Sequence, residues 1–127
     1  MTRALAAAAA AYAAGVSLPA IGAGLNAFQA YAGRLQVKSA RGGATVIDDT
    51  YNANPDSMAA ALSTLAAMPR RRWAVLGGMH ELGSVSVDEH VRVGQLCGQL
   101  GIDHVVGVGQ MAADIVKGAK GARHAVW

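Results

Sequence analysis

The spacing of apolar residues along this 127-residue chain changes several times, and each change predicts a new helix or strand. Residues 45–47 are a short β-branched run, Thr-Val-Ile, which predicts a buried strand. Further on, apolar side chains three or four positions apart predict a helix at residues 55–68: Met58, Leu62, Leu65 and Met68. Asn54 is a preferred N-cap residue and Pro55 suits the first helical position, so the start of this helix is well defined.

The alternation of strands and helices continues to the end of the chain. The predicted elements are a buried strand at residues 73–76, a further strand at 104–108, a starting strand at 123–127, and helices at 87–100 and 111–118. Ser86 and Glu89 have the spacing of a capping box, and Gly101 suits the end of the longer helix. Strands that alternate with helices predict an α/β fold with a Rossmann-like, mostly parallel sheet and right-handed crossovers.

The first part of the chain has a different pattern. Residues 4–25 carry no charge, but most are alanine, and glycines and Pro19 interrupt them. We therefore predict two helices of a soluble protein, at residues 2–14 and 18–28, capped by Gly15 and Ser17 respectively, in preference to a membrane span. A half-exposed strand at residues 35–38 follows.

A turn at Arg41-Gly42-Gly43 then leads from that strand into the strand at residues 45–47. Because the chain begins within a helix and ends on a strand with no helix to cover it, we expect that both ends of a longer protein are missing.

Composition narrows the possible functions. A hydrophobic content of 53% with 15% charged residues indicates a packed core. The net charge is only +3, and the basic run at residues 70–72 has no interleaved aromatic residues, so we interpret it as a solvated turn and expect no nucleic-acid partner. The single cysteine, Cys97, excludes an internal disulfide, fits a reducing compartment and is predicted to be a small buried residue.

Polar side chains gather after the strand at residues 45–47. They are Asp48, Asp49, Tyr51, Asn52 and Asn54. Ligands of open α/β sheets bind at the carboxyl ends of strands, where a carboxylate accepts hydrogen bonds from ribose hydroxyls. The two aspartates could equally be a general acid/base pair or metal ligands, or one of them could cap the loop or the next helix. Asn54 is explained equally well as a ligand-binding residue and as an N-cap.

Three motifs resemble those of the Mur ligases, in the same order. They are Gly33-Arg34-Leu35-Gln36, the block Asp-Asp-Thr-Tyr-Asn-Ala-Asn-Pro-Asp-Ser at residues 48–57, and Val-Leu-Gly-Gly-Met-His-Glu-Leu-Gly at residues 75–83. The resemblance covers nearly the whole chain. It implies that residues 1–32 are the last helices of the central, ATP-binding domain, and that residues 33–127 are a truncated, Rossmann-like C-terminal domain.

The resemblance also implies an activity. The matching ligases use ATP and Mg²⁺ to join D-alanyl-D-alanine to UDP-N-acetylmuramoyl-tripeptide through an acyl phosphate, in the synthesis of peptidoglycan. It implies a cytoplasmic enzyme that is a monomer at full length. The alternatives are another Mur-type amide ligase, which the Tyr-Asn-Ala-Asn-Pro string disfavours, and a non-catalytic α/β nucleotide-binding module.

The same resemblance assigns roles to residues. Arg34 would approach the ATP phosphates and Asp49 the ribose, Tyr51 and Asn52 would complete the nucleotide site, and Asn54 and Asp48 would contact the substrate. An arginine suits phosphate because its charge is permanent and its donors form a fork. The chain contains no Gly-x-x-x-x-Gly-Lys-Ser/Thr phosphate loop, so we expect no catalytic residue within it and Mg²⁺ bound mainly elsewhere in the parent enzyme.

One position departs from the family pattern. Gly78 stands where these ligases usually have an aspartate, which puts an acidic role for this loop in doubt. His80 and Glu81 follow closely, but two candidate ligands without a third make a weak metal motif, and we predict no metal site.

Overall fold

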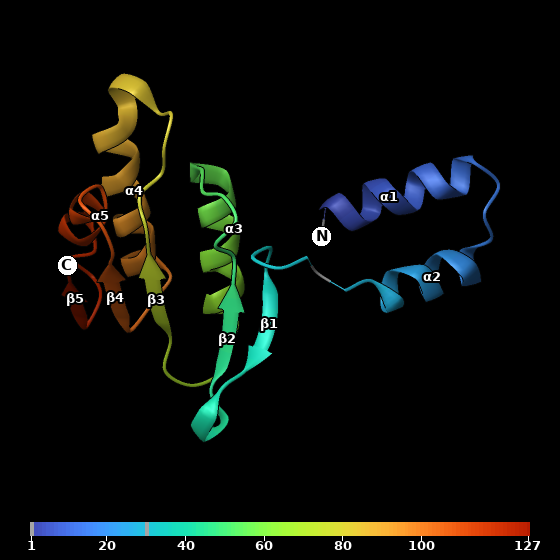
Figure 1. The fold of residues 1–127 in the computed structure, drawn as a ribbon, viewed down its shortest axis with the longest axis horizontal. Coiled ribbons are helices and arrows are strands. Elements are labelled where there is room, and N and C mark those ends of the chain that lie inside the picture. Colours follow the sequence, from blue (N-terminus) through green and yellow to red (C-terminus); the bar gives the residue numbers. More distant parts are fainter. Residues whose placement is uncertain (1, 30) are drawn as a thin grey trace. The chain divides into compact units, whose positions relative to one another are not determined.

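The computed structural model describes residues 2–29 and 31–127 and divides the chain into two units, Met1–Tyr31 and Ala32–Trp127. In the first unit, helices α1 (Thr2–Ala13) and α2 (Leu18–Ala27) are joined by a short loop (Figure 1). The predicted cap at Gly15 is confirmed: its φ is +85°, and its N–H donates to the Tyr12 carbonyl oxygen at 2.9 Å. None of the side chains described between residues 4 and 29 is buried, and none of the described helices has the length and apolar character needed to cross a membrane.

The predicted side-chain cap at Ser17 is wrong. Ser17 has the extended backbone of an N-cap residue, but its side chain makes no capping hydrogen bond within the described structure. An N-cap side chain accepts from the N–H of the second or third helical residue, and Pro19, the second residue, has no N–H.

The second unit begins with a β-hairpin. Strands β1 (Gln36–Ser39) and β2 (Thr45–Asp48) pair in antiparallel fashion, and the 3-10 turn η1 (Arg41–Gly43) joins them as predicted. The prediction that β2 is buried is wrong, because Val46 is 44% exposed. Among the described strands β2 pairs only with β1, and none of its four residues is buried.

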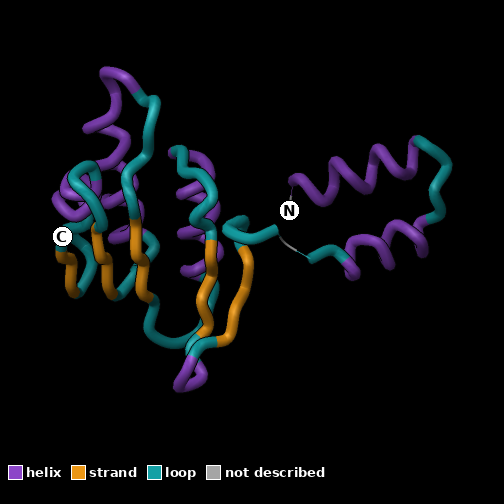
Figure 2. The backbone as a smooth tube through the Cα atoms, viewed as in Figure 1, coloured by secondary structure: helices purple, strands orange, loops and turns teal. Residues whose placement is uncertain are grey.

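After the hairpin, helices and strands alternate along the chain (Figure 2). The elements in chain order are α3 (Pro55–Ala66), β3 (Trp73–Leu76), the 3-10 turn η2 (Gly83–Val85), α4 (Ser86–Gln99), β4 (His104–Gly107), α5 (Ala112–Gly118) and β5 (His124–Val126). Strands β3, β4 and β5 form a parallel sheet in that order, with Trp73 opposite His104 and His104 opposite His124. The predicted α/β fold with a mostly parallel sheet is confirmed.

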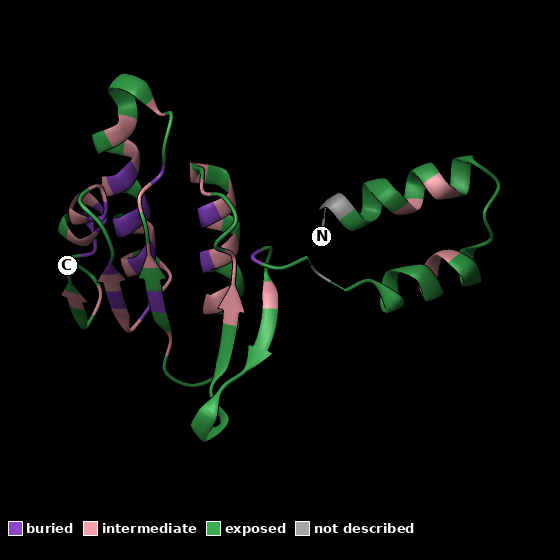
Figure 3. Cartoon of the chain, viewed as in Figure 1, coloured by how far each residue is buried: buried purple, intermediate pink, exposed green. Residues whose placement is uncertain are grey.

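The core lies on one face of the parallel sheet. Side chains alternate along a strand, and Ala74 and Val105 are buried while Val75 is 67% exposed (Figure 3). The buried cluster joins these strands to α3, α4 and α5 through Leu62, Val93, Cys97 and Ile115, among others. The strand at residues 73–76 is therefore buried on one side only, which corrects the prediction of a buried strand.

Helices α4 and α5 approach so closely that no side chain fits at two positions. A Cβ at Gly94 would lie 1.9 Å from the Ile115 carbonyl oxygen, and a Cβ at Gly118 would lie 2.1 Å from the Val91 carbonyl oxygen. Cys97, one turn beyond Gly94, is fully buried as predicted, and burial raises the pKa of its thiol to about 11. It is therefore an apolar core residue.

The predicted capping box at the start of α4 is wrong. The turn η2 runs directly into the helix, so the N-cap position falls on Val85 and Ser86 already has helical backbone angles. A helical residue cannot act as an N-cap because the cap requires a non-helical backbone. Glu89 instead pairs with Arg92 on the surface, at 2.7 Å.

The predicted solvated turn at residues 70–72 needs one correction. Arg72 is half-buried, and its backbone N–H donates to Oδ2 of Asp103 at 2.9 Å. Its carbonyl oxygen accepts from the N–H groups of Asp103 and His104, and Asp103 also pairs with Arg123 at 3.6 Å. This junction holds the first residues of the parallel strands together.

The Asp103 junction predicts acid sensitivity. The hydrogen bond from the Arg72 backbone N–H, and then the Arg72 side chain and Arg123, hold the pKa of Asp103 below its usual value. An unfolded aspartate has a pKa of about 3.9, so the folded state binds fewer protons and Asp103 stabilises it above that pH. We expect this contribution to disappear as the pH falls from about 4 through the lower, folded pKa.

The free energy of unfolding in urea, measured between pH 2 and pH 7 with closely spaced pH values around the unfolded aspartate pKa of about 3.9, tests this effect. Asp103→Asn should lower stability at neutral pH and flatten the acid limb of the curve. Asp88→Asn, which alters an exposed carboxylate in the first turn of α4, should keep the slope of the unmodified chain. An unchanged acid limb in Asp103→Asn would contradict the assignment.

Candidate functional site

The candidate site is built on a tight turn against the carboxyl end of β2. Gly33 is buried there with a φ of +70°, and its carbonyl oxygen accepts a hydrogen bond from the Tyr51 N–H at 2.9 Å. A Cβ at Gly33 would lie 3.0 Å from the Tyr51 nitrogen. Glycine is required at this position because it alone allows both the left-handed backbone and the close approach.

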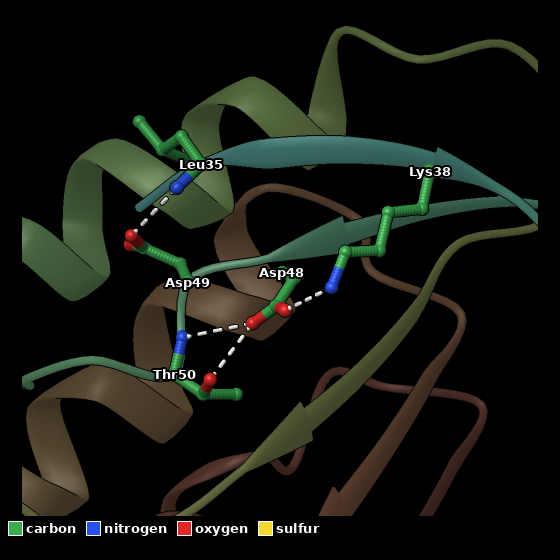
Figure 4. A network of polar contacts seen from close by, with 5 residues as sticks. All are labelled: Leu35, Lys38, Asp48, Asp49 and Thr50. Carbon is green, nitrogen blue, oxygen red and sulfur yellow. Dashed lines mark hydrogen bonds and ion pairs between the residues drawn. The ribbon is translucent and has the colours of Figure 1, made fainter. Parts of the chain in front are cut away.

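Asp49 closes the same turn from the other side. Its Oδ1 accepts a hydrogen bond from the Leu35 N–H at 2.9 Å (Figure 4). Leu35 has a φ of +49°, which is uncommon for a residue with a side chain. Asp49 thus holds the turn that carries Arg34, and its Oδ2 has no hydrogen-bond partner among the residues that the structure describes.

Arg34 and Tyr51 lie in direct contact. The guanidinium carbon of Arg34 lies 4.0 Å from the centroid of the Tyr51 ring, a cation–π geometry. Both residues are exposed, Tyr51 by 68%, so the positive charge remains available to an anion from solvent. The structure therefore brings together Arg34, Asp49 and Tyr51, which the sequence had placed in one site from two separate motifs.

Asp48 has a different environment from its neighbour. Its Oδ2 pairs with Nζ of Lys38 at 2.6 Å, and its Oδ1 accepts from the Thr50 hydroxyl at 2.8 Å and from the Thr50 N–H (Figure 4). These bonds, that of Lys38 first, lower the pKa of Asp48. Both carboxylate oxygens are engaged within the loop, which matches the loop-capping alternative for one of the two aspartates.

The two asparagines contribute to local structure. Asn52 is exposed, and its side-chain oxygen accepts from the next backbone N–H, that of Ala53, at 2.9 Å. Asn54 caps α3: its side chain accepts from the Ser57 N–H at 2.8 Å, and the Ser57 hydroxyl accepts from the Asn54 N–H. The N-cap prediction is confirmed, and Ser57 completes a capping box that the sequence analysis did not identify.

The sequence analysis also missed His90, which anchors the loop after β3. His90 is 1% exposed, and its Nε2 accepts a hydrogen bond from the Met79 N–H at 2.8 Å. The other ring nitrogen, Nδ1, therefore carries the proton and donates to the Ser86 carbonyl oxygen at 2.6 Å. The available signal was the position of His90 on the apolar face of α4, in helical register with Val93 and Cys97.

Two further residues of that loop bear on the predictions. A Cβ at Gly78 would lie 2.6 Å from the Met111 Cβ, so an acidic side chain does not fit at residue 78 unless Met111 moves. His80 and Glu81 are exposed, and the described residues contain no group of three or more His, Cys, Asp or Glu that could hold a metal ion.

A Rossmann-like α/β domain with charged and polar side chains at the carboxyl end of a strand is typical of the class of domains that bind ligands such as nucleotides. Comparison with known families is more specific. The model of the Mur ligase glutamate ligase domain matches residues 33–127, and the chain therefore belongs to the Mur ligase family.

Similar proteins include enzymes named UDP-N-acetylmuramoyl-tripeptide–D-alanyl-D-alanine ligase. The one from Mycobacterium tuberculosis is 46% identical over 116 residues, which cover 86% of this chain and 23% of that protein. The one from Escherichia coli is 44% identical over 112 residues, or 88% of this chain and 25% of that protein. The chain thus spans about a quarter of the length of these relatives.

Solved structures agree with these relatives. A crystal structure of MurF from Acinetobacter baumannii superposes with a TM-score of 0.84 at 41% identity, over 95% of this chain and 26% of that chain. MurF ligase from Thermotoga maritima, solved in complex with ADP, superposes with a TM-score of 0.68 at 27% identity, over 79% of this chain and 22% of that chain.

Proposed function

We propose that this chain is part of an ATP-dependent ligase that joins D-alanyl-D-alanine to UDP-N-acetylmuramoyl-tripeptide in peptidoglycan synthesis. The observation that carries the proposal is the identity of 44% to 46% with ligases of that name, over most of this chain. In this proposal, residues 1–32 belong to the central ATP-binding domain of a cytoplasmic, monomeric enzyme, and residues 33–127 form one wall of its active site.

The proposed nucleotide site consists of Arg34, Asp49, Tyr51 and Asn52. An ADP-bound relative supports a nucleotide at this domain or its neighbours, and the exposed charge of Arg34 on a held turn is suited to phosphate. ATP supplies the phosphoryl group that activates the tripeptide carboxylate. The contribution of this chain is to orient ATP and neutralise its charge, as is usual for phosphoryl transfer.

The proposed substrate residues are Asn54 and Asp48. Because the oxygens of both side chains already accept hydrogen bonds from the protein, they would act mainly by shaping the loop that faces the dipeptide. The described residues contain no group of three or more His, Cys, Asp or Glu that could hold a metal ion, and in this proposal Mg²⁺ is bound mainly by the rest of the enzyme.

A chimera tests the function. We would replace the matching segment of the Escherichia coli relative with residues 33–127 of this chain and measure phosphate release. We expect release only when ATP, the UDP-sugar tripeptide and D-alanyl-D-alanine are all present, and none from the 127-residue chain alone, which has no phosphate loop. Arg34→Ala in the chimera should raise the KM for ATP about tenfold, since a hydrogen bond to a charged group is lost.

Two results would contradict the proposal. Release that depends on a single amino acid in place of D-alanyl-D-alanine would favour another Mur-type amide ligase. A folded chimera that binds ATP but releases no phosphate with any acceptor would favour a non-catalytic nucleotide-binding module. Arg92→Ala, which alters an exposed arginine on α4, is the matched control for a change in net charge and should leave the KM for ATP unchanged.

A further inference from the structure

We propose that Asp49 is a positioning residue, which acts on a bound nucleotide through Arg34 and the phosphates, in addition to any contact that it makes with the ribose. This inference rests on the proposed function, because it assumes that Arg34 meets a phosphate group. Its structural basis is the hydrogen bond from the Leu35 N–H to Oδ1 of Asp49, at 2.9 Å.

The turn that carries Arg34 requires support. Leu35 adopts a left-handed backbone, with a φ of +49°, that residues with a Cβ rarely adopt unless their surroundings impose it. Gly33, on the other side of Arg34, is also left-handed, with a φ of +70°. Two positive-φ residues flank Arg34, so without support from outside the turn the chain would relax toward more common backbone angles.

Two hydrogen bonds supply that support, and both come from the segment that follows β2. The Tyr51 N–H donates to the carbonyl oxygen of Gly33 at 2.9 Å, and Oδ1 of Asp49 accepts from the Leu35 N–H. A bond to a carboxylate is stronger than one to a neutral acceptor. Arg34 is therefore held from both sides, and its guanidinium rests on the Tyr51 ring. The arginine is fixed in place before any ligand arrives.

The direction in which anion affinity changes on removal of Asp49 distinguishes this role from simple charge repulsion. A carboxylate near a phosphate site repels the anion, so removing its charge should by itself strengthen anion binding. If Asp49 acts by holding Arg34, its removal should instead weaken the binding of an anion. A polyphosphate without a ribose separates this role from a direct ribose contact.

The experiment uses the full 127-residue chain, titrated with tripolyphosphate and with ATP in the absence of Mg²⁺, and NMR of the Arg34 side chain as the readout. We expect Asp49→Ala to weaken tripolyphosphate about fivefold and Asp49→Asn, which keeps an acceptor for Leu35, to weaken it less. In an Arg34→Ala background, Asp49→Ala should have no further effect. Asp56→Ala, which removes an exposed carboxylate at the start of α3, should not weaken binding.

Amide hydrogen exchange provides a readout that does not depend on ligand. The Leu35 amide should exchange faster in Asp49→Ala than in the unmodified chain, and the Arg34 side-chain resonances should lose the upfield shift caused by the Tyr51 ring. An Asp49→Ala chain with a protected Leu35 amide would overturn the positioning role. So would a loss of ATP affinity with unchanged tripolyphosphate affinity, which would assign Asp49 to the ribose alone.

The same experiment distinguishes failure of the proposed phosphate contact from failure of the positioning role. If tripolyphosphate produced no saturable change at Arg34 in the unmodified chain, the phosphate contact would be rejected, and with it the ligand part of this inference. The Leu35 exchange rate and the Arg34 shifts would still decide whether Asp49 holds the turn.

Discussion

Gly94→Ala should destabilise the second unit more than almost any other single methyl group added to it. The new Cβ would lie 1.9 Å from the Ile115 carbonyl oxygen, and because this neighbour is backbone it cannot rotate away. Overpacking typically costs about 1–3 kcal/mol, and we expect a loss of at least the upper value because two helices must separate. Alanine favours a helix over glycine by about 0.5–1 kcal/mol. A measured loss of stability would therefore understate the cost of the clash by about that amount.

Urea unfolding followed by circular dichroism measures this loss. Gly118→Ala, which meets the Val91 carbonyl oxygen from the opposite helix at 2.1 Å, should give a similar result. The matched control is Gly77→Ala: within the described residues nothing lies within 4 Å of a Cβ there, and its φ is not in the left-handed region. A Gly94→Ala chain as stable as the Gly77→Ala chain would show that α4 and α5 do not pack as described.

His90→Leu should both destabilise the second unit and release the loop after β3. The substitution introduces an apolar side chain of similar size and leaves the buried Met79 N–H without its acceptor. An unsatisfied buried group costs about 1–3 kcal/mol, a large share of a total stability of about 5–15 kcal/mol. Because Met79 lies within the family motif at residues 75–83, we expect its amide to lose protection from hydrogen exchange.

Two variants make this prediction specific. His90→Gln retains an acceptor and a donor on a flexible side chain and should recover part of the stability. His80→Leu alters an exposed histidine of the same loop and should change the unfolding free energy by less than about 0.5 kcal/mol. Equal stability of His90→Leu and His80→Leu would contradict the role assigned to the buried ring.

The sequence alone predicted the order of the elements and grouped the residues of the candidate site. Helical spacing and the pair Asn54-Pro55 identified α3 and its first residue, and Gly15 identified the end of α1. Both succeeded because helix caps depend on residues that are adjacent in sequence. Arg34, Asp49 and Tyr51 were placed in one site by their motifs. The motifs also indicated the Mur ligase family, with which the comparisons agree.

The tertiary structure decided which faces are buried and what each polar group contacts. The β-branched run of β2 looks like a core strand, yet its exposure depends on which strands pair with it, and that is a long-range property. Ser86 has the composition of a cap, but the turn before it shifted the helix start by one position.

The same limit applies to the site itself. The two adjacent aspartates look alike in sequence, but Asp48 bonds within its own hairpin and loop, while Asp49 reaches across to Leu35, 14 residues earlier. His90 likewise bonds to Met79, 11 residues away, because α4 packs beside the loop after β3. Residue type sets what a side chain can bond, whereas only the folded chain determines which donor or acceptor comes within reach.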